Sequence, residues 1–293
     1  MKAMTNIKKI IIIYNPNSTG DGKKNAQNLR AQLAATSKIN VVLQPTKFAG
    51  HAEKIVKSLD NRDDVMVISS SGDGGYHEVI NGVLSHNEKT SKIITGLLPS
   101  GNANDHYHSV HRGDLAERIV DGDIETIDLI KVSVGDWTRY AHSYAGIGLT
   151  PHIGEKLTQA TLNPINEIWL SIRYYLNFRP VKIYDESGVH RYDSLIFSNV
   201  KRMSKYLTLS HEAKLDDGKF EITGSKAGSF GKLLAHLFKA TTVGLTEEAH
   251  RASTYTFTSK RPIVMQLDGE VFRFGPNSTV TISMALKALR CIV

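Results

Sequence analysis

The stretch SSSGDGGYHEVINGV, residues 69–83, decides the fold. It begins as the end of a short strand, turns through Gly72-Asp73-Gly74-Gly75, and continues with helical spacing. Glycines in such a turn let backbone N–H groups approach a phosphate closely, and the N-terminus of the following helix favours negative charge. The stretch therefore predicts a strand–turn–helix unit with a phosphate site at the turn, although an ordinary loop between a strand and a helix has the same pattern.

The alternation of strand and helix extends to both sides of this stretch. Strand patterns cover residues 8–14, 40–44, 65–70 and 93–98, and helical patterns cover residues 22–35, 52–59 and 77–86. Short apolar strands that alternate with helices indicate a parallel, doubly wound sheet covered on both faces. Ligands of such sheets bind beyond the carboxyl ends of the strands, so we look for a site there.

The pattern changes after about residue 130. The segments KVSVGDW, PVKIYDES, YDSLIFSNV, KFEITGS and STYTFTSK are short, alternating and bounded by turns, which suggests an antiparallel sandwich or barrel. Helical stretches at 166–178 and 230–245 interrupt them. We therefore predict an N-terminal α/β domain at residues 1–131 and a C-terminal antiparallel β-sandwich domain at 132–278, with a segment at 279–293 that returns to the first domain.

Two further polar loops follow predicted strands. GLLPSGNANDHYHSV, residues 96–110, places Asn102, Asn104 and Asp105 after one strand, and NPNSTGDGKK, residues 15–24, follows the first. Loops from neighbouring parallel strands converge, so a nucleotide could be held from several sides. The carboxylate of Asp73 would repel phosphate directly, but it is explained if Mg²⁺ lies between the carboxylate and the phosphates.

Composition excludes several classes of protein. Apolar residues make up 41% and charged residues 22% of the 293 residues, which is typical of a folded globular chain and argues against disorder. The single cysteine, Cys291, rules out an intramolecular disulfide and fits a reducing cytoplasm. The apolar run at 10–13 is too short for a signal peptide, and no stretch approaches the roughly 20 apolar residues of a spanning helix.

The net charge of +7 draws the chain towards polyanions, whether nucleotide, nucleic acid or anionic lipid. A nucleic-acid partner is set aside, because the sequence contains no recognisable nucleic-acid module.

Taken in order, NPNSTG, SGDGGYHEVINGV, LPSGNAND, DLIKV, LDDGKFEI and LDGE resemble the diacylglycerol kinase catalytic family. That family also includes sphingosine kinases and bacterial lipid kinases, with NAD kinases as more distant relatives. The resemblance implies a nucleotide-binding α/β domain, a β-rich lipid-substrate domain and an active site between them. It also implies an ATP- and Mg²⁺-dependent lipid kinase that phosphorylates diacylglycerol to phosphatidic acid, located in the cytoplasm and acting at the inner face of the membrane.

The resemblance also assigns roles to individual residues. Glu270 is the candidate general base, Asp268 belongs to the same DGE motif, and Asp128 matches an aspartate near the catalytic centre. A carboxylate base is also what phosphoryl transfer to an alcohol requires. The residues expected to hold the nucleotide are Asn15, Ser18, Thr19, Gly72, Asp73, Gly74, Gly75, Glu78, Gly101, Asn102, Asn104 and Asp105.

A second metal site is implied by AKLDDGKF, residues 213–220, which resembles a structural Mg²⁺ loop of bacterial relatives. Asp217 would supply a carboxylate, and Lys214 and Lys219 would supply backbone carbonyls. An Asp-Gly hairpin turn explains the same residues equally well.

The sequence departs from the family pattern at the phosphate loops. Gly75 and Asn102 stand where the family has threonine, and Ser71 stands where it has glycine. The alternatives are therefore an inactive relative that binds nucleotide or lipid, or a kinase for a sphingosine-like base, a polyprenol or NAD. A homodimer fits the family, and no single residue requires it.

Overall fold

The computed structural model divides the chain into two compact units. Unit 1 comprises Met1–Leu129 and Ala285–Val293, and unit 2 comprises Ile130–Met284. The structure describes residues 7–18, 20–62, 64–86, 92–110, 113–151, 179–203, 207–228, 230–246 and 249–292. The predicted helical stretch at 166–178 lies outside the described residues.

The sheet of unit 1 is parallel. Its strands are β1 (Lys9–Tyr14), β2 (Asn40–Pro45), β3 (Val65–Ser71) and β4 (Ile94–Pro99), followed at the edge by the end of β17 (Ser278–Ile292), in the order β2-β1-β3-β4-β17. Ile10 to Ile13 of β1 are all buried, as expected for a central strand covered on both faces.

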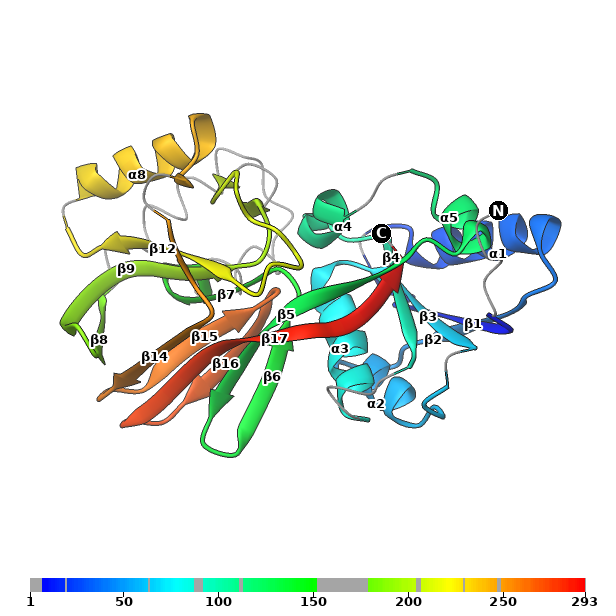
Figure 1. The fold of residues 1–293 in the computed structure, drawn as a ribbon, viewed down its shortest axis with the longest axis horizontal. Helices are drawn as coiled ribbons and strands as arrows, with labels where there is room; N and C mark the ends of the chain where they lie inside the picture. The colour runs from blue at the N-terminus through cyan, green and yellow to red at the C-terminus, as the bar shows by residue number, and fades with distance from the viewer. Residues whose placement is uncertain are drawn as a thin grey trace. The chain divides into compact units, whose positions relative to one another are not determined.

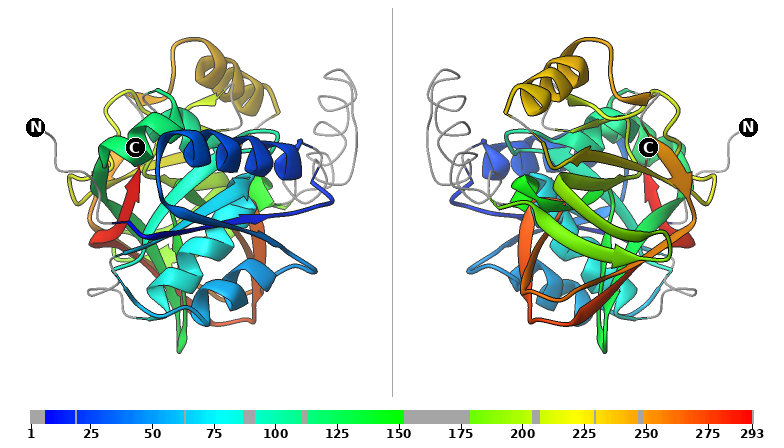
Figure 2. Two further views of the ribbon diagram at one scale, coloured as in Figure 1. Left: turned by 90° about the vertical axis from the view of Figure 1, so that its right-hand side faces the viewer. Right: turned by 90° about the vertical axis from the view of Figure 1, so that its left-hand side faces the viewer.

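Helices cover both faces of this sheet. On one face, α1 (Gly22–Thr36) and α5 (Leu115–Asp121) pack on the strands through a shared apolar core. On the other face lies α3 (Asp73–Leu84), which packs against α2 (His51–Lys57), and the short α4 (Asp105–Val110) follows β4 (Figures 1 and 2). The predicted doubly wound α/β fold is confirmed.

Unit 2 is built from antiparallel strands. They are β5 (Ile124–Val134, of which the residues up to Leu129 belong to unit 1), β6 (Trp137–Ala141), β7 (Tyr144–Gly148), β8 (Val181–Asp185), β9 (Gly188–Ser198), β12 (Phe220–Lys226), β13 (His250–Ala252), β14 (Thr254–Ser259), β15 (Ile263–Leu267) and β16 (Glu270–Phe274). A short pair, β10 (Arg202–Met203) and β11 (Leu207–Thr208), and the helix α8 (Phe230–Thr242) complete the described elements. Phe197, Phe220 and Phe257 lie in a core to which most of these strands contribute. The predicted antiparallel character of this part is confirmed.

The strand β17 takes part in both units. Its first residues pair antiparallel with β14, and Arg290 and Cys291 pair parallel with β4. Between these two pairings Lys287 adopts a positive φ of 47°, and its N–H donates to the carboxylate of Asp128 at 2.6 Å. The strand bends where its partners change.

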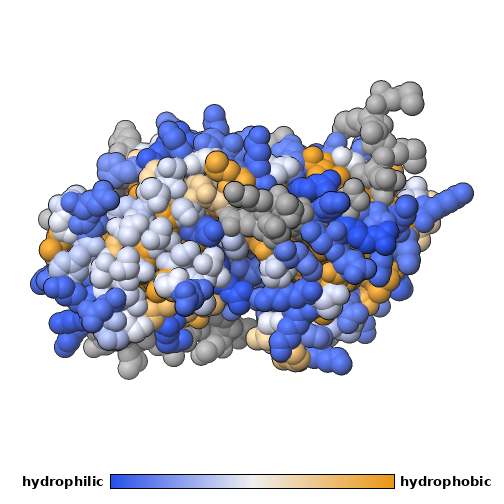
Figure 3. Space-filling view, turned by 60° about the horizontal axis from the view of Figure 1, so that its bottom comes forward, coloured by the Kyte–Doolittle hydropathy of each residue, from blue (hydrophilic) through white to orange (hydrophobic). Residues whose placement is uncertain are grey.

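The surface drawn in Figure 3 is largely hydrophilic, with apolar residues distributed in small groups. Large exposed apolar side chains include Phe48, Phe238 and Val243. In the part of the chain that the structure describes, no helix is both long enough and apolar enough to cross a membrane.

Candidate functional site

Three loops of unit 1 interlock at the carboxyl ends of neighbouring strands. They follow β1, β3 and β4. Ser70 at the end of β3 donates from its hydroxyl to the carbonyl of Gly22 at 2.8 Å and lies 3.2 Å from the hydroxyl of Ser100. The amide of Asn25 on α1 also donates to Ser100, at 3.0 Å. The structure therefore brings the three loops that the sequence predicted as phosphate loops side by side.

Glycines allow this close approach of the loops. A Cβ atom on Gly101 would lie 2.4 Å from the Cα atom of Gly72, and one on Gly20 would lie 2.5 Å from the carbonyl oxygen of Ser100. Both distances are far below van der Waals contact, so a side chain at either position would push the loops apart. The backbones of the loops touch directly at this end of the sheet.

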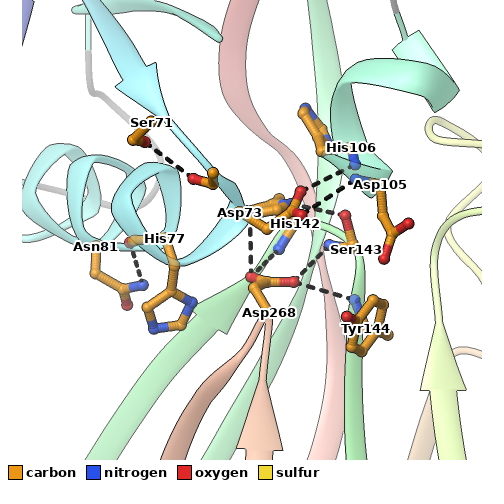
Figure 4. Close-up of polar contacts among 11 residues, drawn as sticks. Ser71, Asp73, His77, Asn81, Asp105, His106, His142, Ser143, Tyr144 and Asp268 are labelled. Atoms are coloured by element: carbon orange, nitrogen blue, oxygen red, sulfur yellow. Dashed lines mark hydrogen bonds and ion pairs between the residues drawn. The ribbon is translucent and has the colours of Figure 1, made fainter. Parts of the chain in front are cut away.

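Asp73 fastens two of the loops together. It is the first residue of α3 and is 8% exposed. Its carboxylate accepts the backbone N–H of Asp105 at 3.1 Å and that of His106 at 3.2 Å (Figure 4). Asp73 therefore caps α4, and because each carboxylate oxygen has more than one acceptor site, the group can still bind another ligand.

Asn104 shapes the loop that follows β4. Its φ of 54° lies in the left-handed region, which asparagine tolerates better than most residues. The side-chain oxygen accepts the N–H of Gly101 at 3.0 Å, and the side-chain nitrogen donates to the carbonyl of Gly101 at 2.9 Å. This amide closes the turn, while the side chain of Asn102 is exposed.

The loop after β1 is stabilised by its own polar side chains. The exposed Asn15 accepts the N–H of Asn17 at 2.9 Å, and the hydroxyl of Ser18 donates to the carbonyl of Gly20 at 3.1 Å. Thr19, which the sequence also assigned to the nucleotide, lies outside the described residues.

Glu78 has the contacts of a helix cap. Its two carboxylate oxygens accept the N–H groups of Gly50 at 2.7 Å and Ala52 at 3.0 Å, at the start of α2. One turn further along α3, a Cβ atom on Gly82 would lie 2.7 Å from the side chain of Val56. The EVING sequence thus joins α3 to α2, which gives Glu78 a role that the sequence analysis did not foresee.

The side chain of Ser71 fills the space beside the Cα atom of Gly75. A Cβ atom on Gly75 would lie 2.4 Å from the hydroxyl oxygen of Ser71 and 2.6 Å from its Cβ. The Ser71 hydroxyl also lies 2.7 Å from that of Ser69 and 2.9 Å from the carbonyl of Gly72. The two departures from the family pattern are therefore linked, because the serine side chain fills the room that a residue-75 side chain would need.

In unit 2, Asp268 anchors the turn that carries Glu270. Its carboxylate, 1% exposed, accepts three backbone N–H groups, from His142 at 2.9 Å, Ser143 at 2.9 Å and Tyr144 at 3.1 Å. Figure 4 shows Asp268 directed at these residues, and the ring of the buried His142 lies 3.4 Å from it. The 142–144 backbone was not anticipated, because nothing in its sequence marks it as a partner of the DGE motif.

The turn itself presents Glu270. Asp268 and Gly269 both have positive φ, 49° and 101°, and they connect β15 to β16 as a two-residue hairpin. Glu270 follows as an exposed side chain. An exposed carboxylate on a rigid turn is suited to reach a substrate hydroxyl.

Asp128 and Asp217 have backbone or arginine partners. Asp128, 2% exposed, accepts the N–H of Lys287 in unit 1. Asp217 in unit 2 accepts the N–H of Lys219 at 3.1 Å and pairs with the guanidinium of Arg251, while Lys214 is exposed. Among the described residues no group of three or more His, Cys, Asp or Glu is gathered as a metal site.

Comparisons with known proteins agree with the family resemblance. The family model described as diacylglycerol kinase catalytic domain matches residues 9–132. A diacylglycerol kinase of Staphylococcus saprophyticus is 26% identical over 73% of this chain and 72% of its own length. Sphingosine kinase 1 of Arabidopsis thaliana is 34% identical over 33% of this chain, and mitochondrial acylglycerol kinase of Homo sapiens is 26% identical over 43%. These two matches cover only 21% and 32% of the relatives' own lengths.

Solved structures share the fold along the whole chain. The crystal structure of a diacylglycerol kinase from Bacillus anthracis str. Sterne has a TM-score of 0.70 at 20% identity and covers 98% of this chain and 97% of its own. A second structure from that organism has a TM-score of 0.74 at 21% identity. At this identity the likeness establishes the fold. Residues 9–132 of this chain, a little under half of its 293 residues, match the diacylglycerol kinase catalytic domain.

Proposed function

We propose that this chain is an ATP-dependent lipid kinase that transfers the γ-phosphate to the hydroxyl of diacylglycerol and yields phosphatidic acid. One observation carries the choice of acceptor. The match to the Staphylococcus saprophyticus diacylglycerol kinase extends over 73% of this chain, whereas the sphingosine and acylglycerol kinase matches cover 33% and 43%. The diacylglycerol kinase match is longer than unit 1 and therefore extends into unit 2, where the family resemblance places the lipid.

The interlocked loops of unit 1 support nucleotide binding. Their backbone N–H groups and the start of α3 offer donors and a favourable dipole to phosphate oxygens. Gly72 and Gly101 leave no side chain between the loops and a bound phosphate. Asn15, Ser18, Asn102 and Asn104 are the neighbouring polar side chains that we assign to the nucleotide.

Asp73 and Asp105 form a pair that suits Mg²⁺. They are buried, 8% and 3% exposed, and are joined by a hydrogen bond from the backbone of Asp105. Mg²⁺ in kinases is held by one or two carboxylates together with the phosphates, so two aspartates are a sufficient protein contribution. An ion held there would neutralise charge on the phosphates.

Glu270 is the proposed base. It accepts the proton of the lipid hydroxyl as the hydroxyl oxygen bonds to the γ-phosphorus and the bond to the β–γ bridging oxygen breaks, which releases ADP. Asp268 is better described as a positioning residue, because its carboxylate is engaged by the 142–144 backbone. We assign Asp128 a positioning role also, since it holds the bend of β17.

We infer that the lipid is met at a membrane surface. The net charge of +7 favours association with anionic bilayers, and the acceptor is a membrane lipid.

Phosphorylation of a lipid panel in mixed micelles tests the proposal. The panel contains diacylglycerol, sphingosine, monoacylglycerol and a polyprenol, with radiolabelled ATP and Mg²⁺. We expect label in diacylglycerol, and a loss of about 10²–10⁴-fold in turnover for Glu270→Gln with ATP affinity unchanged. Glu186→Gln is the matched control, because Glu186 is an exposed glutamate of unit 2 on the β8–β9 turn.

The other outcomes are equally informative. Label in a different lipid would show that the chain is a lipid kinase with that lipid, and not diacylglycerol, as its acceptor. NAD is tested separately as a soluble acceptor. ATP binding without phosphorylation of any lipid or of NAD would favour the inactive nucleotide-binding relative. A Glu270→Gln protein with full turnover would remove Glu270 from the reaction.

A further inference from the structure

The loop at residues 213–220 is held by protein groups on both sides of its aspartate. One carboxylate oxygen of Asp217 accepts the N–H of Lys219 at 3.1 Å, which closes the turn. The other accepts a hydrogen bond from the Nη2 atom of Arg251. Both oxygens of the side chain that was expected to bind a metal thus face N–H donors.

Arg251 reaches this loop from a neighbouring strand. It lies on β13, directly opposite Glu221 of β12 in the antiparallel register. Its Nε atom is 3.3 Å from the Oε1 atom of Glu221, whose side chain is 1% exposed. One guanidinium therefore bridges two carboxylates, that of Asp217 in the loop and that of Glu221 in the sheet.

The electrostatics of this cluster require a cation. Burying the Glu221 carboxylate without a counter-charge costs several kcal/mol, and the partly exposed carboxylate of Asp217 adds a second negative charge beside it. Burial raises the pKa of Glu221 to about 7, Arg251 acts in the opposite direction, and Asp217 adds to the rise. Arginine remains protonated in proteins, so its charge is permanent, and its planar fork suits paired carboxylates.

A divalent ion does not fit the same place. It would have to approach Asp217 against the positive charge of a guanidinium that already binds one of the carboxylate oxygens. The described residues also supply no third acidic or imidazole ligand there.

We propose that Arg251 is the built-in cation of the 213–220 loop, which fixes Asp217 and ties the loop to Glu221 without a bound metal. The loop is then metal-independent in this chain, and its integrity depends on one arginine of β13. This proposal concerns the folding of unit 2 and stands apart from the kinase reaction.

Thermal unfolding of the protein without nucleotide tests this role. Any difference in Tm between EDTA and Mg²⁺ or Ca²⁺ should have the same size in the wild-type protein and in Asp217→Asn. Arg251→Met should lower the Tm by about 5–10 °C, since it leaves the buried carboxylate of Glu221 without its cation. Arg251→Lys should fall between the wild-type protein and Arg251→Met, because it keeps the charge and loses the fork. Arg191→Met is the control, since Arg191 is an exposed arginine on β9 of the same unit.

A double variant separates the pair from unrelated effects. Arg251→Met combined with Asp217→Asn should lose less stability than the sum of the two single variants. An additive loss, or an Arg251→Met protein as stable as wild type, would overturn the proposal.

A comparison of metal binding in the wild-type protein and in Asp217→Asn decides the matter even where an Arg251 variant fails to fold. A divalent-ion stabilisation that disappears in Asp217→Asn, or stoichiometric metal bound to purified wild-type protein and absent from Asp217→Asn, would restore the metal loop. A change in Tm with Mg²⁺ or Ca²⁺ that is equal in the wild-type protein and in Asp217→Asn would come from another part of the molecule. We expect this result, because the proposal gives Asp217 no metal to bind.

Discussion

Ser71 and Gly75 show how a single side chain decides which residues its neighbours can be. The family has glycine and threonine at these positions, and this chain has serine and glycine. Because the Ser71 hydroxyl lies where a residue-75 side chain would begin, the family's threonine cannot be restored at residue 75 alone without displacing Ser71. The chain thus lacks the family's hydroxyl at residue 75 and has the hydroxyl of Ser71 close to the same place.

This leads to a prediction for Gly75→Thr. The added Cβ would lie 2.4 Å from Ser71 Oγ, so the start of α3 must shift, at a cost of about 1–3 kcal/mol for overpacking. We expect a lower Tm and weaker binding of an ATP analogue. Ser71→Gly combined with Gly75→Thr removes the clash and should recover both.

A control for this test is Gly275→Thr. Gly275 has nothing within 4 Å of an added Cβ, so this substitution should leave the Tm and the affinity for the analogue near wild type. If the double variant is no better than Gly75→Thr alone, the two positions are not coupled and the shared-space explanation is wrong.

At the scale of elements, the hydrophobic pattern was sufficient to place the strands of unit 1. The predicted strand at 93–98 is β4 at Ile94–Pro99, and the predicted helix at 22–35 is α1 at Gly22–Thr36. Such elements have strong local signals, since an apolar run or a helical period is present in the segment itself. The same local signals located the loops that we predict to bind phosphate.

Other features depend on partners that are distant in sequence. Glu78 was assigned to the nucleotide, yet its carboxylate caps α2, some 26 residues earlier in the chain. Asp268 accepts N–H groups from residues 142–144, more than 120 positions away. A carboxylate in a motif has the same sequence signature whether it binds a ligand or caps a backbone, so only the tertiary structure separates the two.

Asp268 therefore carries a stability prediction for the β15–β16 hairpin. Asp268→Ala leaves three buried backbone N–H groups without an acceptor, each costing about 1–3 kcal/mol. We expect a Tm at least about 6 °C lower, and a smaller loss for Asp268→Asn, which keeps one acceptor oxygen. Asp136→Ala, at the exposed β5–β6 turn, is the matched control.

Turnover is a second measurement on the Asp268 variants, and it separates a positioning role from a role in the reaction. If Asp268 only positions the hairpin, the turnover that remains in folded Asp268→Asn should exceed that of Glu270→Gln. Equal losses in the two proteins, with Asp268→Asn as stable as wild type, would instead assign Asp268 to the reaction itself.

At the scale of the whole molecule, unit 1 is discontinuous in the chain. Its sheet is complete only when the end of β17 reaches β4, after the chain has passed through unit 2. Thr95 of β4 donates to the carbonyl of Arg290, 195 residues later. Contacts this distant in sequence close slowly during folding, so the last strand of unit 1 should be added late.

The stability of unit 1 should therefore depend on the last residues of the chain. Leu289 is fully buried, whereas Leu286, three residues earlier on β17, is 66% exposed. Leu289→Ala should cost about 2–5 kcal/mol, the usual range for a leucine removed from a core, whereas Leu286→Ala should cost little. Urea unfolding with hydrogen exchange at the β4 amides measures both effects. Equal losses in the two variants, or β4 amides as well protected in Leu289→Ala as in wild type, would show that the sheet of unit 1 is stable without its returning strand.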